Sequence, residues 1–261
     1  MINFNRVWAM ALRYTLNLTK NYDRLADMFY WPIVDILLWG LTGTYFVKES
    51  NNPNVIIIVL TGIIFWIVVW RAAYEIDINL LTELWDQSLI NIFAAPLTLL
   101  EWIASFIIFG SVKTMVSLIF AGILSFILFQ YNIFIYGLWI VPLIISLLIT
   151  GWVIGFIVAA YLIRYGQKVQ AIAWAATFIV APFSAPYYPL DTLPNWAQLI
   201  AFFIPASYIF EGMREILFTG TISYAKLVIS FALNIIYLLL SIWFFIYMFK
   251  RSRKLGLGRL Q

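Results

Sequence analysis

Six long apolar stretches constrain the fold of this 261-residue sequence more than any other feature. They run at about residues 28–47, 55–75, 103–129, 137–163, 169–188 and 226–249. About 20 apolar residues in a helix cross a hydrocarbon core about 30 Å thick, so each stretch is long enough to span a bilayer. Trp and Tyr are frequent near the ends, where interfacial anchors belong. We predict an all-α integral membrane protein with six transmembrane helices, in a single domain over residues 1–261.

The composition supports a membrane protein. Apolar residues make up 64% of the chain and charged residues 11%, whereas soluble domains have about 25% charged residues. The net charge of +4 does not indicate a nucleic-acid partner, because the basic residues gather at the ends of the apolar stretches. The chain has no Cys and no His, which removes disulfides and the commonest transition-metal ligands, and we expect no metal site.

Charge asymmetry predicts the orientation in the cell membrane. An even number of crossings puts both termini on one side, and cytoplasmic flanks carry the excess of Lys and Arg. The loop 164–168 is basic, while the loops 48–54 and 130–136 carry little or no charge. Both termini are therefore expected to be cytoplasmic. The basic residues that flank the first and last stretches are Arg6, Arg13, Lys20, Arg24, Lys250, Arg251, Arg253, Lys254 and Arg259.

Residues 1–24 are predicted to include an amphipathic helix that lies in the membrane interface. At 100° per residue, Phe4, Trp8, Leu12 and Leu16 share one face. The opposite face carries Arg6, Arg13 and Lys20. The helix could anchor the chain on anionic lipid or bind a partner protein, and its sequence favours neither.

The segment 76–100 separates the second and third apolar stretches. Its apolar residues recur at helical spacing among acidic ones and stop at Pro96, which predicts a short amphipathic cytoplasmic helix. A solvated connector would show the same pattern. The residues of interest here are Glu83, Trp85, Asp86, Leu89, Phe93 and Pro96.

Residues 189–215 are predicted to be re-entrant from the outer side. The apolar part is short and contains Pro205, and a separate crossing there would put the basic C-terminus outside. Glu211 and Arg214 are three residues apart and could form an ion pair that holds the segment. Tyr187 and Tyr188 add aromatic rings, which could line an outer gate or belong to an ordinary interfacial belt.

Asp35 and Lys113 are the clear isolated charges inside the predicted spans. A charge at the centre of a lone inserted helix costs about 2.5–3.5 kcal/mol, so neither should face lipid. They could pair with each other, or each could reach the cytoplasmic boundary separately.

The order of these elements resembles that of the ABC type-2 transporter permeases. In segment 182–214, PFSAPYYPLDTLPNWAQLIAFFIPASYIFEGMR, a small-residue break precedes family-like residues at Pro189, Leu193, Pro194, Pro205 and Arg214. Residues 83–102, ELWDQSLINIFAAPLTLLEW, are similar to the family's cytoplasmic coupling segment, and the matching positions are Trp85, Leu89, Phe93 and Pro96. The chain departs from the family at Ser184-Ala185, where Ser-Gly is commoner.

This resemblance implies a permease that dimerises, binds ATP-binding cassette subunits and moves a lipid-like, drug-like or glycan substrate outward. Trp85, Leu89 and Phe93 would be apolar contacts with the ATPase, and Glu83 and Asp86 would pair with its basic groups. The sequence contains no G-x-x-x-x-G-K-[ST] phosphate loop, so ATP and Mg²⁺ are expected on a partner chain. A secondary transporter without an ATPase stays open as an alternative; a membrane-embedded enzyme would have to use Asp35 without His or Cys.

Overall fold

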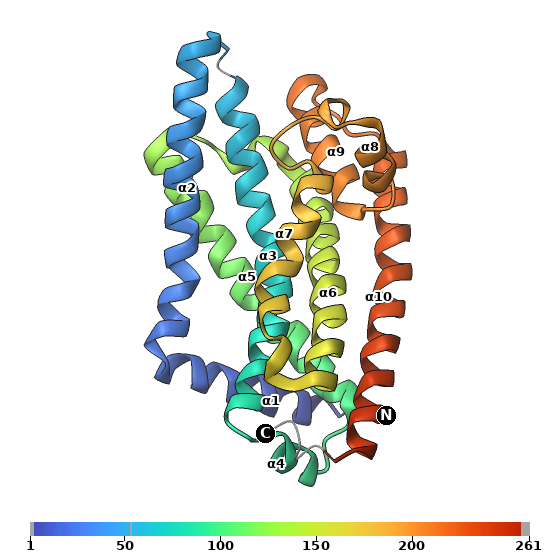
Figure 1. Ribbon diagram of the computed structural model, residues 1–261. Helices are drawn as coiled ribbons and strands as arrows, with labels where there is room; N and C mark the ends of the chain where they lie inside the picture. Colours follow the sequence, from blue (N-terminus) through green and yellow to red (C-terminus); the bar gives the residue numbers. More distant parts are fainter. Residues whose placement is uncertain (1–2, 53, 257–261) are drawn as a thin grey trace.

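The computed structural model describes residues 3–52 and 54–256, which form helices and turns without a strand (Figure 1). The α-helices are α1 (Phe4–Lys20), α2 (Tyr22–Ser50), α3 (Asn54–Trp85), α4 (Leu89–Ala94), α5 (Leu99–Phe129), α6 (Ile140–Tyr165), α7 (Ala171–Ser184), α8 (Asn195–Ala201), α9 (Pro205–Thr219) and α10 (Tyr224–Lys254). Three 3₁₀ turns lie between them: η1 (Ile133–Trp139), η2 (Gly166–Val169) and η3 (Leu190–Thr192).

Five of these helices are long and apolar enough to cross a membrane, which confirms the predicted all-α membrane fold. They are α2, α3, α5, α10 and the helix that contains α6. The sixth predicted span corresponds to α7, which has only 14 residues and is about 21 Å long at 1.5 Å per residue. It ends early because Ala185 adopts a left-handed conformation and Pro186 follows.

The long helices run side by side, and the shorter elements gather at the two ends of the bundle (Figure 1). Helix α1 lies crosswise at one end, where α4 and the last turns of α10 also lie. The turn between α2 and α3 lies at the opposite end, with α9. The start of α1 and the end of α10 are therefore on the same side of the bundle.

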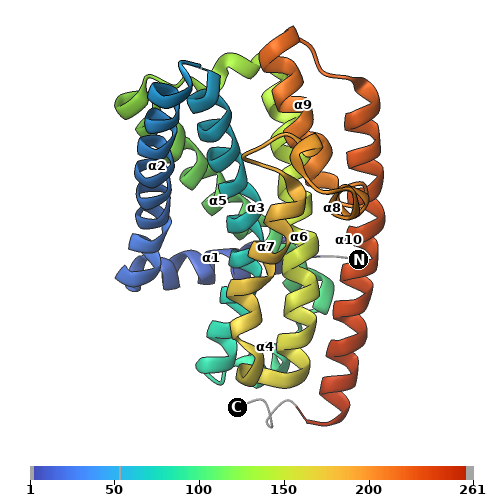
Figure 2. The same cartoon turned by 45° about the horizontal axis from the view of Figure 1, so that its top comes forward.

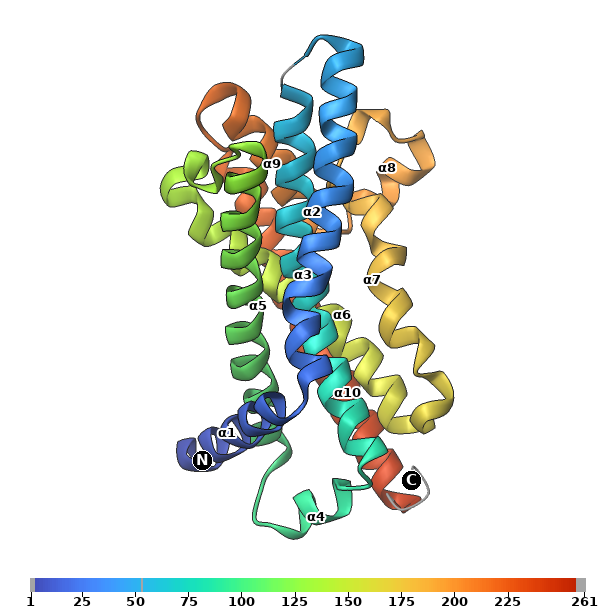
Figure 3. The same cartoon turned by 90° about the vertical axis from the view of Figure 1, so that its left-hand side faces the viewer.

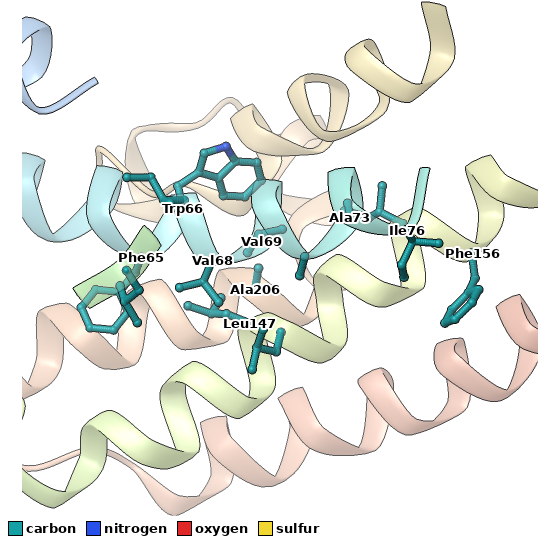
Figure 4. Close-up of a cluster of buried hydrophobic side chains, with 14 of the residues drawn as sticks. Phe65, Trp66, Val68, Val69, Ala73, Ile76, Leu147, Phe156 and Ala206 are labelled. Atoms are coloured by element: carbon teal, nitrogen blue, oxygen red, sulfur yellow. The ribbon is translucent and has the colours of Figure 1, made fainter. Parts of the chain in front are cut away.

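Helices α3 and α6 pack against each other at the centre of the bundle, and small residues let their backbones approach closely (Figure 4). A Cβ atom at Gly151 would lie 2.6 Å from the Cβ of Ala72, and one at Gly155 would lie 2.9 Å from the carbonyl oxygen of Ala73. Two small residues four apart on one helix are a common means of close helix packing in membranes. This contact fixes α3 along one side.

The predicted boundary between the second span and the cytoplasmic segment needs a correction. Residues 76–85 do not form a separate amphipathic helix, because α3 continues without a break to Trp85. The acidic residues Glu75, Asp77 and Glu83 are buried against other helices of the chain. They therefore do not mark the point where the helix leaves the bundle. The short helix in this segment is α4, with six residues.

The segment predicted to be re-entrant forms α8 and α9 beside the first half of α10 (Figure 2). Proline marks each start: Pro189 and Pro194 directly precede η3 and α8, and Pro205 is the first residue of α9. Proline suits these positions because its backbone nitrogen has no hydrogen to leave unpaired. Gly220 ends α9 with a φ of +78°.

Candidate functional site

Residues 85–98 form a projecting connection between α3 and α5 (Figure 3). Trp85 is 44% exposed and Ile90 is 48% exposed, and Asp86 and Pro96 are also exposed. These side chains form an outward-facing knob with a partly apolar surface. Sequence reasoning missed Ile90, although its place beside Leu89 puts the two on different faces of α4.

Two residues predicted as ATPase contacts point inward instead. Leu89 is 2% exposed, and the Phe93 ring packs on the rings of Trp102 and Phe249 at centroid distances of 5.1 and 4.8 Å. Both side chains therefore anchor α4 to the bundle. On α4, the exposed apolar side chain is that of Ile90.

Glu83 also turns inward. Its carboxylate is buried and accepts a hydrogen bond from Arg13 Nη2 at 2.8 Å, and it contacts the Ser88 hydroxyl. At the other end of the connection, Glu101 accepts a backbone N–H from Asn3 at 2.8 Å and lies 3.7 Å from Arg6. The partner of Glu83 in this structure is Arg13 on α1, and its pairing with a basic group of the ATPase stays a prediction.

Helix α1 is thus held against the bundle by the residues that flank the connection. Its buried side is formed by Val7, Ala11, Tyr14 and Leu18. The stripe identified from the sequence faces away from the bundle, and Phe4 and Trp8 are 69% and 58% exposed. An exposed apolar stripe on a helix that lies across the bundle end fits a place in the membrane interface. Lys20 is exposed in its last turn.

A buried cluster of four charged residues joins α2, α3 and α5. Arg71 Nη1 lies 2.6 Å from Asp27 Oδ2, and Arg71 Nη2 donates to the Asp27 carbonyl oxygen at 2.7 Å. Lys113 Nζ lies 2.5 Å from Glu75 Oε1, which is 3.5 Å from Arg71. Two positive and two negative charges compensate one another, as burial requires.

The structure does not bring Asp35 and Lys113 together. Lys113 has Glu75 as its partner, so the proposed pair across α2 and α5 is wrong. The sequence did not indicate Glu75 as the partner of Lys113, because the residues after Glu75 resemble a cytoplasmic segment. The spacing of Arg71 and Glu75, four residues apart, was the available signal that the two lie on one helix face.

Asp35 lies instead in an aromatic cavity of about 600 Å³, which we call the aromatic groove. Helices α2, α3 and α7 and the chain after α7 form it. Figure 4 shows that Trp66 points to the side of α3 opposite Leu147. The lining residues include Trp31, Trp39, Trp66, Trp70, Trp174, Phe178, Tyr187 and Tyr188.

The loop after α7 completes the groove at its outer end. The ring of Tyr187 stacks on Trp39 with centroids 4.7 Å apart, and the Tyr188 hydroxyl donates to the carbonyl oxygen of Pro182 at 2.7 Å. The loop also rests on α3, where a Cβ at Gly62 would lie 2.3 Å from the Pro186 carbonyl oxygen. Two sets of residues predicted separately, the outer tyrosines and Asp35, therefore meet in one cavity.

Arg214 of α9 ties this loop to the outer segment. Its guanidinium contacts Glu211 Oε2 at 2.5 Å, as the spacing of the two residues suggests, and donates to the carbonyl oxygen of Ala185 at 3.0 Å. Ala185 has a φ of +50°, a left-handed conformation that favours glycine. The geometry gives a physical reason for the glycine that is commoner here in the resembling family.

Within the described residues, no group of three or more acidic side chains is placed to hold a metal ion. The site contains a cavity that a molecule can enter. One wall of this cavity is α3, which continues to the exposed knob at the other end of the bundle.

Two comparisons with known proteins bear on the family of this chain. No match was found among proteins with curated functions. The sequence does match the family described as ABC-2 type transporter over residues 7–218, which runs from α1 to α9 and includes the knob, the charge cluster and the aromatic groove. Because this match covers most of the chain, the protein belongs to the ABC-2 type transporter family, whose members are membrane permeases that pair with an ATP-binding cassette component.

Proposed function

We propose that this chain is the membrane-spanning permease of an exporter driven by a separate ATP-binding cassette ATPase. Its substrate would be a lipid-like, drug-like or glycan molecule that leaves the cytoplasm or the inner leaflet. The observation that carries the proposal is the partly apolar knob of Trp85, Asp86 and Ile90, which projects from the bundle in a member of a family that pairs with an ATPase.

The shape of α3 supports a mechanical link between the knob and the groove. This helix has 32 residues, and at 1.5 Å per residue it is about 48 Å long. It carries Trp66 and Trp70 in the groove wall and Trp85 at the knob. A displacement of the knob by a bound ATPase would move the groove wall with it, because the helix has no proline or other break between these residues.

The distribution of charge supports cytoplasmic termini in the cell membrane. Lys250, Arg251, Arg253 and Lys254 lie in the last turns of α10, at the end of the bundle that also carries α1 and the knob. The positive-inside rule places this end in the cytoplasm, where ATP is available. ATP and Mg²⁺ would bind the partner, because the chain contains no phosphate-binding loop.

The permease would act as a homodimer in contact with lipid. Trp31, Leu38 and Leu41 of α2 and Phe178 and Ile179 of α7 are exposed on both sides of the groove. Either lipid or a second copy of the chain has to cover this exposed apolar surface of α2 and α7. A dimer formed along these helices would place two grooves close together and enlarge the path available to a substrate.

Co-purification tests the ATPase partnership. The full-length chain would be expressed with the ATP-binding cassette protein encoded beside its gene, purified in detergent and assayed for ATP hydrolysis. We expect a stable complex with the wild-type chain. Trp85→Ala and Ile90→Ala should each lower the amount of ATPase recovered by about tenfold, because each removes an exposed apolar contact at the knob.

Trp243→Ala and Ile229→Ala are the matched controls. Both residues are exposed on α10, away from the knob, and their variants should retain the ATPase. A folded, monodisperse wild-type chain that recovers no ATPase would contradict the proposal. Equal losses in the knob variants and in the controls would contradict the assignment of the knob.

A further inference from the structure

The tryptophans of this chain are concentrated in one place. Five of the 12 line the aromatic groove, together with two tyrosines, so they do not form only a belt at the membrane interfaces. A volume of about 600 Å³ is in the range of cavities that bind drug-sized molecules. The groove is therefore large enough to hold one substrate molecule against several indole faces.

Asp35 gives this groove a negative charge. It lies one helical turn from both Trp31 and Trp39 on α2. In the part of the chain that the structure describes, its carboxylate has no hydrogen bond and no ion pair. Arg71 acts on it only through space and is already held by Asp27 at 2.6 Å and Glu75 at 3.5 Å. The charge of Asp35 is left for a ligand to neutralise.

The residues that line the groove favour some classes of ligand over others. Among the described residues, no Lys or Arg lines the groove, so an anion or a phosphate headgroup would meet Asp35 without a compensating positive charge. A single carboxylate is too few oxygen ligands for a Ca²⁺ or Mg²⁺ ion. A glycan could stack on the rings and donate hydrogen bonds to Asp35, but it would leave the charge of the carboxylate without a counter-charge.

An organic cation satisfies every one of these conditions. Indole faces attract cations, most strongly when water is excluded, and the carboxylate supplies the full counter-charge. The apolar and aromatic groups of such a molecule would contact the remaining surface of the groove. Entry from the bilayer is open between α2 and α7, where Trp31 is 44% exposed and Phe178 is 63% exposed.

We infer that the aromatic groove binds a lipophilic organic cation with a single positive charge, and that Asp35 is its counter-ion. This inference rests on the proposed transport function and narrows its substrate class. Trp66 and Trp70 connect the bound cation to the helix that ends at the knob, so occupation of the groove and movement of the knob would influence each other.

Two ions of the same shape and opposite charge test this inference. Tetraphenylphosphonium and tetraphenylborate would be titrated separately into the full-length chain in nanodiscs of zwitterionic lipid, with empty nanodiscs subtracted, and quenching of Trp fluorescence would be followed. We expect saturable binding of the phosphonium and at least tenfold weaker saturable binding of the borate. Asp35→Asn should lower the phosphonium affinity about tenfold, while Asp35→Glu should largely retain it.

Asp191→Asn is the matched control, because Asp191 is an exposed carboxylate outside the groove, and it should bind the phosphonium as the wild type does. Equal affinity for the two ions, wild-type affinity in Asp35→Asn, or no saturable binding because a second copy fills the groove would each overturn the inference. ATPase co-purification is independent of these results. A complex without cation binding removes only the substrate class, whereas cation binding without a complex removes the ATP-driven exporter and keeps the cation site.

Discussion

Helix α2 carries two aspartates, Asp27 and Asp35, in very different surroundings. They are about 12 Å apart along the helix at 1.5 Å per residue. Asp27 contacts Arg71 at 2.6 Å in a cluster that Lys113 and Glu75 complete. Asp35 faces the aromatic groove without an ion pair among the described residues. The paired carboxylate holds helices together, and the unpaired one leaves its charge available for a ligand.

The largest effect on stability is expected in the charge cluster that contains Asp27. Lys113→Met would leave the buried Glu75 with only Arg71, 3.5 Å away, as a positive neighbour. Removing one partner of a buried ion pair costs about 3–5 kcal/mol, and we expect a value near the lower limit because Arg71 remains. Unfolding by SDS in mixed micelles would measure the loss.

Two further variants separate lost charge pairing from lost packing. Lys113→Arg should keep most of the stability because it keeps the positive charge. The double variant Lys113→Met with Glu75→Gln should lose less than Lys113→Met alone, because no uncompensated charge then remains. A double variant as unstable as the sum of both single variants would show that the pair is not coupled.

Arg214 extends the comparison to the outer end of the bundle. Arg214→Met would remove charged hydrogen bonds to Glu211 and to the Ala185 carbonyl oxygen. Because the Glu211 side chain is 30% exposed and water can replace part of these contacts, we expect a total loss of about 1.5–3 kcal/mol, smaller than that of Lys113→Met. Thermal unfolding in detergent would measure it, with protease cleavage between residues 185 and 205 rising in parallel. Unchanged cleavage would mean that other contacts hold the loop.

The two aspartates can be compared directly with the same substitution. Asp27→Asn should destabilise the protein by about 1.5–3 kcal/mol because Arg71 loses a charged partner. Asp35→Asn should change stability by less than about 1 kcal/mol, and a gain is expected, because it removes a partly buried charge that has no ion pair. Unfolding by SDS checks both. A large loss in Asp35→Asn would show that Asp35 is structural and that the contrast between the two sites is wrong.

The positions of the long helices could be read from the sequence because uninterrupted apolar stretches report directly on length and solvent. The end of α3 could not, because Glu75 and Glu83 look like signs of a cytoplasmic segment unless their partners are known. Those partners, Lys113 and Arg13, come from other helices, and hydropathy carries no information about such contacts. The aromatic groove could not be predicted from the sequence for the same reason. Asp35 and Tyr187 are far apart in the sequence and meet only in the folded bundle.

The smallest effect is expected at a partly exposed pair, Glu215 with Lys226. The Ser223 backbone N–H and the Lys226 ammonium, 3.1 and 3.0 Å from Glu215 Oε2, lower the pKa of this carboxyl below its ordinary value. Because the pKa is lower in the folded state, the stabilisation is complete above the ordinary value of about 4.3 and is lost as the pH falls through the folded pKa.

The melting temperature of the wild type should therefore exceed that of Glu215→Gln by about 1–2 °C at pH 7, and the two should converge near pH 3. Using the difference between the two proteins removes the contribution of the other carboxyls that titrate in the same range. A difference that stays constant or widens on acidification would mean that Ser223 and Lys226 do not favour the ionised carboxylate. The partly exposed pair would then contribute nothing measurable, in contrast to the buried cluster around Lys113.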